Sequence, residues 1–244
     1  MKKNCRYAFI HSFRGKPWNE ECRVAYNGFK KLGFECVLFT TNEEIAFRKK
    51  EDIVVGGMLI MSSVLDEYGI QTENYNYPDE LNYILGRRIW TTELKNLHNE
   101  KMPFFVKPVE EKIAQGMVIN SDKDLSEYDN LNGETKMLCS EVVDFLSEWR
   151  CFILNGEIIG IQHYKGDKTL VCNEKLIEKA VEKCVDFPSA YTLDFGVTDD
   201  GRTLLIEMND GYSIGCYGLN DVLYAKFLYA RWAELTGTVD ECDF

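Results

Sequence analysis

Hydrophobic and polar positions follow two different patterns along the chain, and the change falls near residue 75. In the first part, short apolar runs that predict strands alternate with segments of helical periodicity. These elements come in the order strand, helix, strand, strand, helix, over residues 6–13, 19–33, 34–40, 52–57 and 58–69. Strands that alternate with helices are typical of a parallel sheet. We therefore predict a small parallel α/β domain over residues 1–75.

Ligands of such domains bind beyond the carboxyl ends of the strands. Arg14 and Lys16 lie in the loop that follows the first predicted strand. They are candidates to hold an acidic substrate. The alternative is that this loop is an ordinary exposed turn.

The second part predicts a separate α+β domain over residues 76–244. Its opening segment, residues 74–97, has the pattern of a link followed by a helix that carries Arg87, Arg88 and Trp90. Short strands bounded by prolines and polar turns come next, and they indicate a mostly antiparallel sheet.

Two hairpins and two helices complete the second part. The hairpins are marked by Asn-Gly at 155–156 and Asp-Gly at 200–201, which are favoured two-residue turns. Helical periodicity returns at residues 173–185 and 220–237. We expect the helix at 173–185 to cover the sheet and the aromatic residues of the helix at 220–237 to pack in a core.

The second hairpin carries polar residues inside strands that otherwise look like core. With a two-residue turn at 200–201, residues whose numbers sum to 401 lie opposite each other, so Asp194 faces Glu207 and Thr192 faces Asn209. Two carboxylates at that spacing need a cation or a shared proton. Oxygen ligands of this kind suit Mg²⁺ or Mn²⁺. The alternative is a polar face turned to solvent.

The first hairpin gathers polar residues at its open end. If residues whose numbers sum to 311 are paired, Glu148, Arg150, His163 and Lys165 lie on one face. This grouping predicts the edge of a site, or else a hairpin end that runs out into solvent.

Composition narrows the classes of function. The net charge of −12, from 28 basic and 40 acidic residues, disfavours nucleic acid as a partner. No apolar run is long enough to span a membrane. The apolar run near the N-terminus is broken by His11 and Arg14, which is not typical of a signal peptide. Nine cysteines without a C-x-x-C pair argue against a zinc site or a disulfide framework, so we expect a cytoplasmic protein.

Three segments in sequence resemble a known family. The chain has no phosphate-binding G-x-x-x-x-G-K-[ST] and no full set of kinase motifs. Instead, "FFVKP", "CSEVVDFLSEWRCFILNGEIIG" and "LDFGVTDDGRTLLIEMNDG" follow one another in the order found in the ATP-grasp superfamily of carboxylate–amine ligases. The likeness covers roughly residues 80–220 and extends in a general way to ribosomal-protein glutamate ligases. It implies an ATP-grasp fold after the small α/β domain.

The resemblance also implies roles for individual residues. Lys107 would contact the ATP phosphates, Glu148 would bind the ribose, and Arg150 would lie near the phosphates or the acyl group. Arg88 would join the nucleotide site, and Lys165 the catalytic groups. The hinge that offers backbone groups to adenine would be Ser140, Glu141, Val142 and Val143. The metal ligands would be Asp194, Glu207 and Asn209. The glycine-rich phosphate lid of the family is thin here, with Gly116 alone in "EEKIAQGMV".

The predicted function is that of an ATP- and Mg²⁺-dependent ligase. It would convert a carboxylate of a small molecule or peptide to an acylphosphate, which an amine then attacks. The alternatives are an ATP-grasp phosphotransferase and a non-catalytic nucleotide-binding or assembly protein. Retention of all three predicted metal ligands disfavours the last of these.

Overall fold

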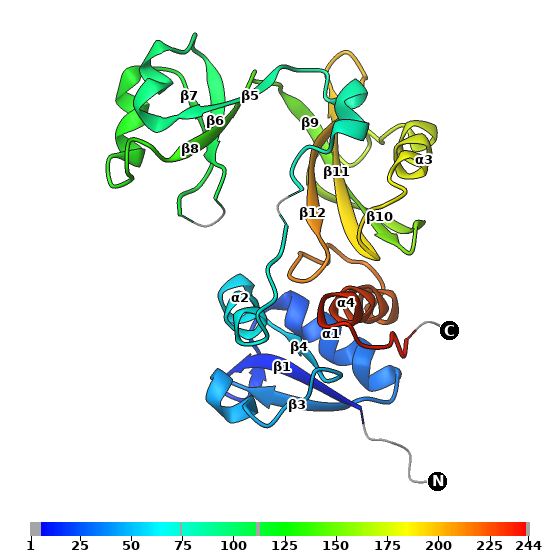
Figure 1. Ribbon diagram of the computed structural model, residues 1–244. Helices are drawn as coiled ribbons and strands as arrows, with labels where there is room; N and C mark the ends of the chain where they lie inside the picture. Colours follow the sequence, from blue (N-terminus) through cyan, green and yellow to red (C-terminus); the bar gives the residue numbers. More distant parts are fainter. Residues whose placement is uncertain (1–5, 74, 111–112, 243–244) are drawn as a thin grey trace.

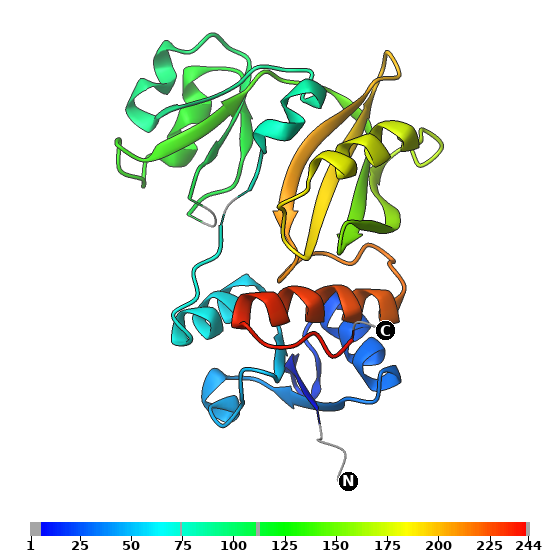
Figure 2. The same ribbon diagram turned by 45° about the vertical axis from the view of Figure 1, so that its right-hand side comes forward.

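A computed structural model describes residues 6–73, 75–110 and 113–242, and it contains three four-stranded sheets. Figures 1 and 2 show one sheet in an N-terminal unit and the other two side by side above it. In the described part of the chain, no helix is long and apolar enough to cross a bilayer.

The N-terminal unit is built around strand β1, which pairs in parallel with β3 on one side and β4 on the other. A short β2 returns antiparallel to β1. The elements are β1 (Tyr7–Phe13), β2 (Lys16–Pro17), α1 (Glu20–Lys31), β3 (Glu35–Phe39), η1 (Asn42–Ile45), β4 (Ile53–Val55) and α2 (Met58–Glu67). Helix α1 begins where the Asn19 side chain accepts a hydrogen bond from the Cys22 backbone, and the chain turns away after it at Gly33, whose φ is +84°.

The C-terminal helix α4 (Asp221–Thr236) packs into the core of this N-terminal unit. Gly28 of α1 permits the close approach, because a Cβ there would lie 2.0 Å from the Asp221 carbonyl oxygen. The sequence-based division assigned residues 220–237 to the second domain. In the structure, Phe227 and Trp232 of that helix share a core with Phe9 and Phe29.

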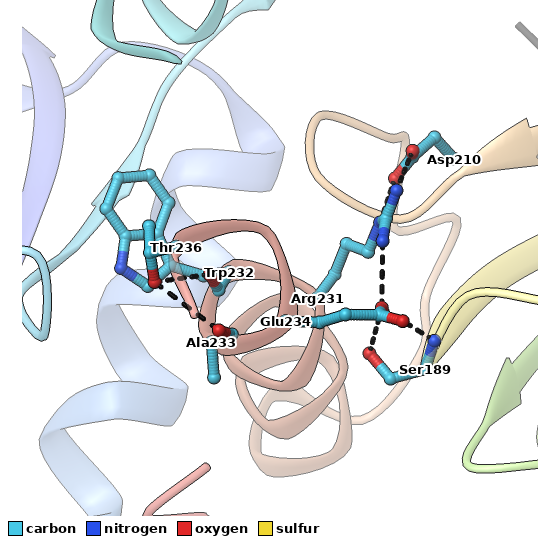
Figure 3. A network of polar contacts seen from close by, with 7 residues as sticks. All are labelled: Ser189, Asp210, Arg231, Trp232, Ala233, Glu234 and Thr236. Atoms are coloured by element: carbon cyan, nitrogen blue, oxygen red, sulfur yellow. Dashed lines mark hydrogen bonds and ion pairs between the residues drawn. The ribbon is translucent and has the colours of Figure 1, made fainter. Parts of the chain in front are cut away.

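Helix α4 is also tied to the third sheet by buried charges (Figure 3). Arg231 donates to both carboxylate oxygens of Asp210, at 2.7 and 2.6 Å, and both side chains are 7% exposed. Glu234 accepts hydrogen bonds from the backbone and hydroxyl of Ser189 and pairs with Arg231. The helix therefore joins the end of β12 and the start of β11 to the N-terminal unit.

The second sheet has the strand order β5-β8-β6-β7, and all of its neighbouring strands are antiparallel. Its elements are β5 (Ile89–Glu93), η3 (Leu94–Asn99), β6 (Phe104–Pro108), β7 (Met117–Ile119), η4 (Asp122–Tyr128) and β8 (Lys136–Ser140). Phe104 and Val106 point into a core on one face. Phe105 and Lys107 point from the other face toward the third sheet.

The helix predicted within residues 74–97 is wrong. That segment forms a short 3-10 helix, η2 (Asp79–Ile84), then strand β5, and then η3. Gly86 interrupts it with a φ of +61°, where the Leu204 side chain leaves no room for a Cβ. Residues 89–93 then pair with β8, which supplies the hydrogen bonds that a helix would otherwise make internally.

The third sheet has the order β10-β9-β11-β12 and packs against α3. Its elements are β9 (Phe145–Leu154), β10 (Glu157–Gly166), α3 (Glu174–Lys183), β11 (Ala190–Thr198) and β12 (Thr203–Asp210). In the hairpin of β11 and β12, Asp194 lies opposite Glu207 and Thr192 opposite Asn209, as predicted. The predicted two-residue turn is wrong, because the residue numbers of paired residues near the turn sum to 400 and not to 401. A register shift between Phe195 and Asp194 then restores the predicted sum of 401.

The predicted register of the hairpin of β9 and β10 is partly wrong. Shifts between Ile158 and Gly160 and between His163 and Lys165 place Gln162 opposite Arg150 and Lys165 opposite Glu148. His163 instead lies opposite Trp149, and the two rings contact each other with centroids 5.0 Å apart. Each extra residue in a bulge reverses the face of the side chains that follow it, so His163 leaves the face of Glu148 and Arg150.

Candidate functional site

A cavity of about 460 Å³ lies between the second and third sheets, where the chain crosses from β8 to β9. Its walls combine apolar rings with a few charged side chains, which is typical of small-molecule sites. The lining residues used below are Tyr77, Arg87, Phe105, the crossing segment 140–145, Glu148, Lys165 and Glu207.

The crossing segment connects the two sheets. Ser140 is the last residue of β8 and is buried, whereas Val142 is 37% exposed. Glu141 exchanges two hydrogen bonds with Arg88: its backbone N–H donates to the Arg88 carbonyl, and its carboxylate accepts from the Arg88 N–H. All four residues predicted as the hinge, residues 140–143, line the cavity.

Lys107 lies at the end of this cavity nearest β12. Its ammonium group donates to a Glu207 carboxylate oxygen at 3.0 Å and to the Asn76 side-chain oxygen. The Asn209 side-chain amide lies 3.4 Å from the other Glu207 oxygen. Lys107, Glu207 and Asn209 also line an adjoining cavity of about 340 Å³, which shares Gly116 and Glu207 with the first. Three predicted site residues, Lys107 from β6 and Glu207 and Asn209 from β12, thus come together here.

Asp194 is more deeply buried than Glu207 and pairs with a different cation. Both of its oxygens accept from the Arg150 guanidinium, at 2.8 and 2.7 Å, and the two side chains are 3% and 7% exposed. Burial raises the pKa of the Asp194 carboxyl. Pairing with Arg150 lowers this pKa, and the nearby Glu207 charge raises it. The like-charge pair expected from the sequence is therefore divided between two cations, Arg150 and Lys107.

An aromatic pair covers the Arg150 guanidinium. Its central carbon lies 4.8 Å from the Tyr217 ring and 5.8 Å from the Tyr164 ring. These two rings stack with centroids 4.9 Å apart. Tyr217 has a φ of +41°, in the left-handed region that non-glycine residues seldom adopt. The pair was not predicted, because Tyr164 reaches this face only through the bulge in β10.

Glu148 and Lys165 meet at the edge of the large cavity. The Lys165 ammonium donates to Glu148 at 2.6 Å, while Glu148 is buried and Lys165 remains largely exposed. Tyr164 also interacts with Glu148, and burial together with nearby carboxylates raises the pKa of its phenol. Glu148 is therefore a buried acceptor with a largely exposed cation beside it.

Arg88 does not reach the cavity between the sheets. Its guanidinium lies 4.6 Å over the Trp90 ring and lines a different cavity on the outer side of the crossing segment. The preceding residue, Arg87, takes the predicted place and donates to the carbonyl oxygens of Leu205 and Ile206 on β12. The sequence analysis predicted a helix here instead of strand β5. Without the strand, no signal in the sequence showed which of the two adjacent arginines faces the cavity.

The cysteines near the site are buried. Each of the eight cysteines in the described ranges is a free thiol. Cys139 is inaccessible to solvent, and burial raises its pKa to about 12. Burial also raises the pKa of Cys216. A thiolate nucleophile is therefore disfavoured at both positions.

A cavity of about 310 Å³ lies beyond Asn209, between the third sheet and the N-terminal unit. Its charged lining residues are all acidic: Glu73, Glu110 and Asp210. Asp210 is already paired with Arg231. The predicted candidates Arg14 and Lys16 instead form the β1–β2 turn, where the Arg14 guanidinium lies over the Phe13 ring.

Glu207 and Asn209 have the oxygen donor atoms that a Mg²⁺ ion prefers. Both side chains offer oxygen atoms to the same cavity. Among the described residues, however, no three His, Cys, Asp or Glu side chains are grouped to hold a metal. A cation at this position would therefore take further oxygens from its ligand or from water.

The fold matches solved structures of ATP-grasp ligases. An L-amino acid ligase from Bacillus licheniformis is 12% identical with a TM-score of 0.58, over 100% of this chain and 78% of that one. D-alanine–D-alanine ligase from Bacillus anthracis, complexed with ATP, is 14% identical with a TM-score of 0.57, over 96% and 97%. The macrocyclase MdnC from Microcystis aeruginosa MRC, bound to precursor peptide MdnA, is 14% identical with a TM-score of 0.51, over 91% and 99%.

The sequence narrows the class further. Residues 84–227, more than half of the chain, match the model of the family described as "ATP-grasp domain, R2K clade family 2". The protein belongs to this family of the ATP-grasp superfamily. A comparison with curated proteins found no match.

Proposed function

We propose that the protein is an ATP-dependent ligase that joins a carboxylate to an amine through an acylphosphate. The observation that carries the proposal is the pair of adjoining cavities that share Glu207 and Gly116. One cavity has apolar rings and the backbone of the crossing segment along its wall, which suit a nucleoside. The other has a lysine, a carboxylate and an amide suited to phosphates and a metal ion.

In this proposal the nucleoside lies against residues 140–143, and its ribose hydroxyls donate to Glu148. The phosphates extend toward Lys107, whose ammonium group then exchanges Glu207 for phosphate oxygens. Glu207 and Asn209 would hold Mg²⁺, which when bound would supply positive charge to the phosphate oxygens. Arg150 contributes through its charge beneath the tyrosine pair, with Asp194 holding it in position. Asp194 would itself reach the metal only by releasing one oxygen from Arg150.

The amine substrate is assigned to the acidic cavity beyond Asn209. Its lining carboxylates Glu73 and Glu110, for which the described residues show no ion pair, attract an ammonium group and repel a second anion. The proposed metal ligand Asn209 lines this cavity too, so an amine there lies next to the place where the acylphosphate forms. A role for Lys165 in the reaction remains a prediction, because its ammonium group lies on Glu148 at the opposite end.

Incubation with Mg-ATP and pooled amino acids and peptides, followed by mass spectrometry, tests the proposal. We expect ADP together with a new amide. ADP with a stable phosphoester would favour phosphoryl transfer instead. Tight ATP binding without turnover would favour a non-catalytic nucleotide-binding protein.

Lys107→Ala is expected to weaken ATP binding about tenfold or more, because a charge-assisted bond to phosphate contributes about 1.5–3 kcal/mol. The melting temperature should change little, since the ion pair with Glu207 is partly exposed and worth about 0–1 kcal/mol. Calorimetry measures the affinity. Lys136→Ala, which changes an exposed lysine at the start of β8 in the same sheet, is the control. Equal ATP affinity in both variants would remove Lys107 from the site.

A further inference from the structure

A fourth cavity, of about 540 Å³, lies on the outer side of the crossing segment. It shares Arg87, Glu141, Val142 and Val143 with the nucleotide cavity proposed above, but neither Lys107 nor Glu148 lines it. Side chains alternate along β5, so Trp90 packs with the core on the far face of the second sheet. The two cavities therefore lie on opposite sides of the same segment.

The charge of this cavity is opposite to that of the whole chain. The net charge of the protein is −12, yet four cationic side chains line this cavity against two carboxylates. The cations are Arg87, Arg88, Lys101 and Arg202, and the carboxylates are Glu100 and Glu141.

Two of the four cations are committed to other groups. Arg87 donates to backbone carbonyls of β12, and Arg202 pairs with Asp200 at 2.7 Å. For the side chains of Arg88 and Lys101, the described ranges contain no ion pair and no hydrogen-bond acceptor. These two cations are thus available to an incoming anion.

The aromatic wall restrains one of these cations. The central carbon of the exposed Arg88 guanidinium lies 4.6 Å from the centroid of the Trp90 ring, and such a contact restrains a guanidinium while its N–H groups can still donate. The Trp90 indole N–H is buried and lacks a hydrogen-bond partner in the described part of the chain. A planar guanidinium whose N–H edge is free matches the two oxygens of a phosphate or carboxylate.

We propose that this cavity is a second ligand site, which takes a small molecule bearing a phosphate or carboxylate group. Arg88 binds the oxyanion through its N–H edge, and Lys101 adds a second positive charge. The occupant lies against the hinge, because the backbone of Arg88 exchanges two hydrogen bonds with Glu141. The site is separate from the proposed ligase centre and does not depend on that function.

Titration calorimetry with pyrophosphate and with malonate, each without nucleotide, tests the site. We expect at least one probe to bind to wild type and to Lys107→Ala, in which the proposed phosphate position is removed. The double variant Arg88→Gln/Lys101→Gln should bind that probe about tenfold or more weakly, as loss of charge-assisted bonds predicts. The probe that binds more tightly identifies the oxyanion as phosphate or carboxylate.

Lys95→Gln/Lys136→Gln is the matched control, because it removes two exposed cations, one on η3 and one on β8, that lie outside the cavity. It should retain the wild-type affinity. The proposal is overturned if neither probe binds, or if both double variants lose affinity equally through general charge. It is also overturned if Lys107→Ala abolishes binding while Arg88→Gln/Lys101→Gln does not. That last result would place the anion in the nucleotide cavity and leave the proposed ligase function intact.

Discussion

Glu207→Gln is expected to lower the rate of ATP turnover about 100-fold or more while the protein stays folded. Glu207 is the carboxylate at the junction of the two cavities, where it would hold the metal that polarises the phosphates. Metal polarisation of a phosphoryl group contributes several kcal/mol to the transition state, and each 1.4 kcal/mol is a factor of ten in rate. ADP release measures this rate.

The metal-free stability of this variant separates a metal ligand from a structural ion pair. From the sequence alone, removing one of two facing carboxylates would relieve repulsion and raise the melting temperature. The structure changes this expectation, because Lys107 already neutralises Glu207 and Arg150 neutralises Asp194. We now expect a melting temperature equal to wild type or slightly lower, since a partly exposed pair contributes about 0–1 kcal/mol.

Glu157→Gln, an exposed glutamate on β10, controls for the loss of one negative charge. It should retain the wild-type rate. A Glu207→Gln variant that keeps its ATP turnover but melts much lower would show that Glu207 is a structural partner of Lys107. The assignment of Glu207 to the metal would then be wrong.

Arg150→Met is expected to reduce the free energy of unfolding by about 3–5 kcal/mol, because it leaves the Asp194 carboxylate buried without a cation. Chemical denaturation measures the loss. The double variant Arg150→Met/Asp194→Leu should recover much of the stability, since neither member of this pair then leaves an unpaired charge buried. Additive losses in the double variant would contradict a direct pairing.

The stability of the single variant Arg150→Met should depend on pH. Burial already raises the pKa of Asp194 in wild type, and without Arg150 the opposing influence is gone. A carboxyl whose folded-state pKa is raised binds more protons in the folded state. The folded state therefore loses stability as pH rises from the unfolded pKa through the folded one. We expect Arg150→Met to be less stable at pH 8 than at pH 5, relative to wild type at each pH.

Local patterns in the sequence were sufficient to predict several features of the site. The alternation of side chains along a strand and the polar positions of the last hairpin predicted that Asp194 faces Glu207, and the structure pairs them. The same alternation requires Phe105 and Lys107 to share one face of β6, and both line the cavities of the site. These predictions succeed because the period of a strand is set by its own backbone.

Contacts between distant segments could not be predicted in this way. The alternation of polar residues does not show which cation meets which carboxylate. Lys107 and Glu207 lie 100 residues apart in sequence, and Arg150 and Asp194 lie 44 apart. The bulges in β10 turn His163 away from the site and Tyr164 into it. A bulge depends on packing against neighbouring strands and has no sure signature in the strand itself.

The sequence by itself determined the strands of the last hairpin, the face that carries its polar residues and the family resemblance, since these depend on order and spacing along one chain. Only the tertiary structure decided that α4 belongs to the N-terminal core and that Arg87 rather than Arg88 enters the cavity. Helix α4 is apolar on nearly every side, so its sequence shows that it is buried but not against what. The energy that selects its partner comes from close packing, which Gly28 permits from a position almost 200 residues earlier.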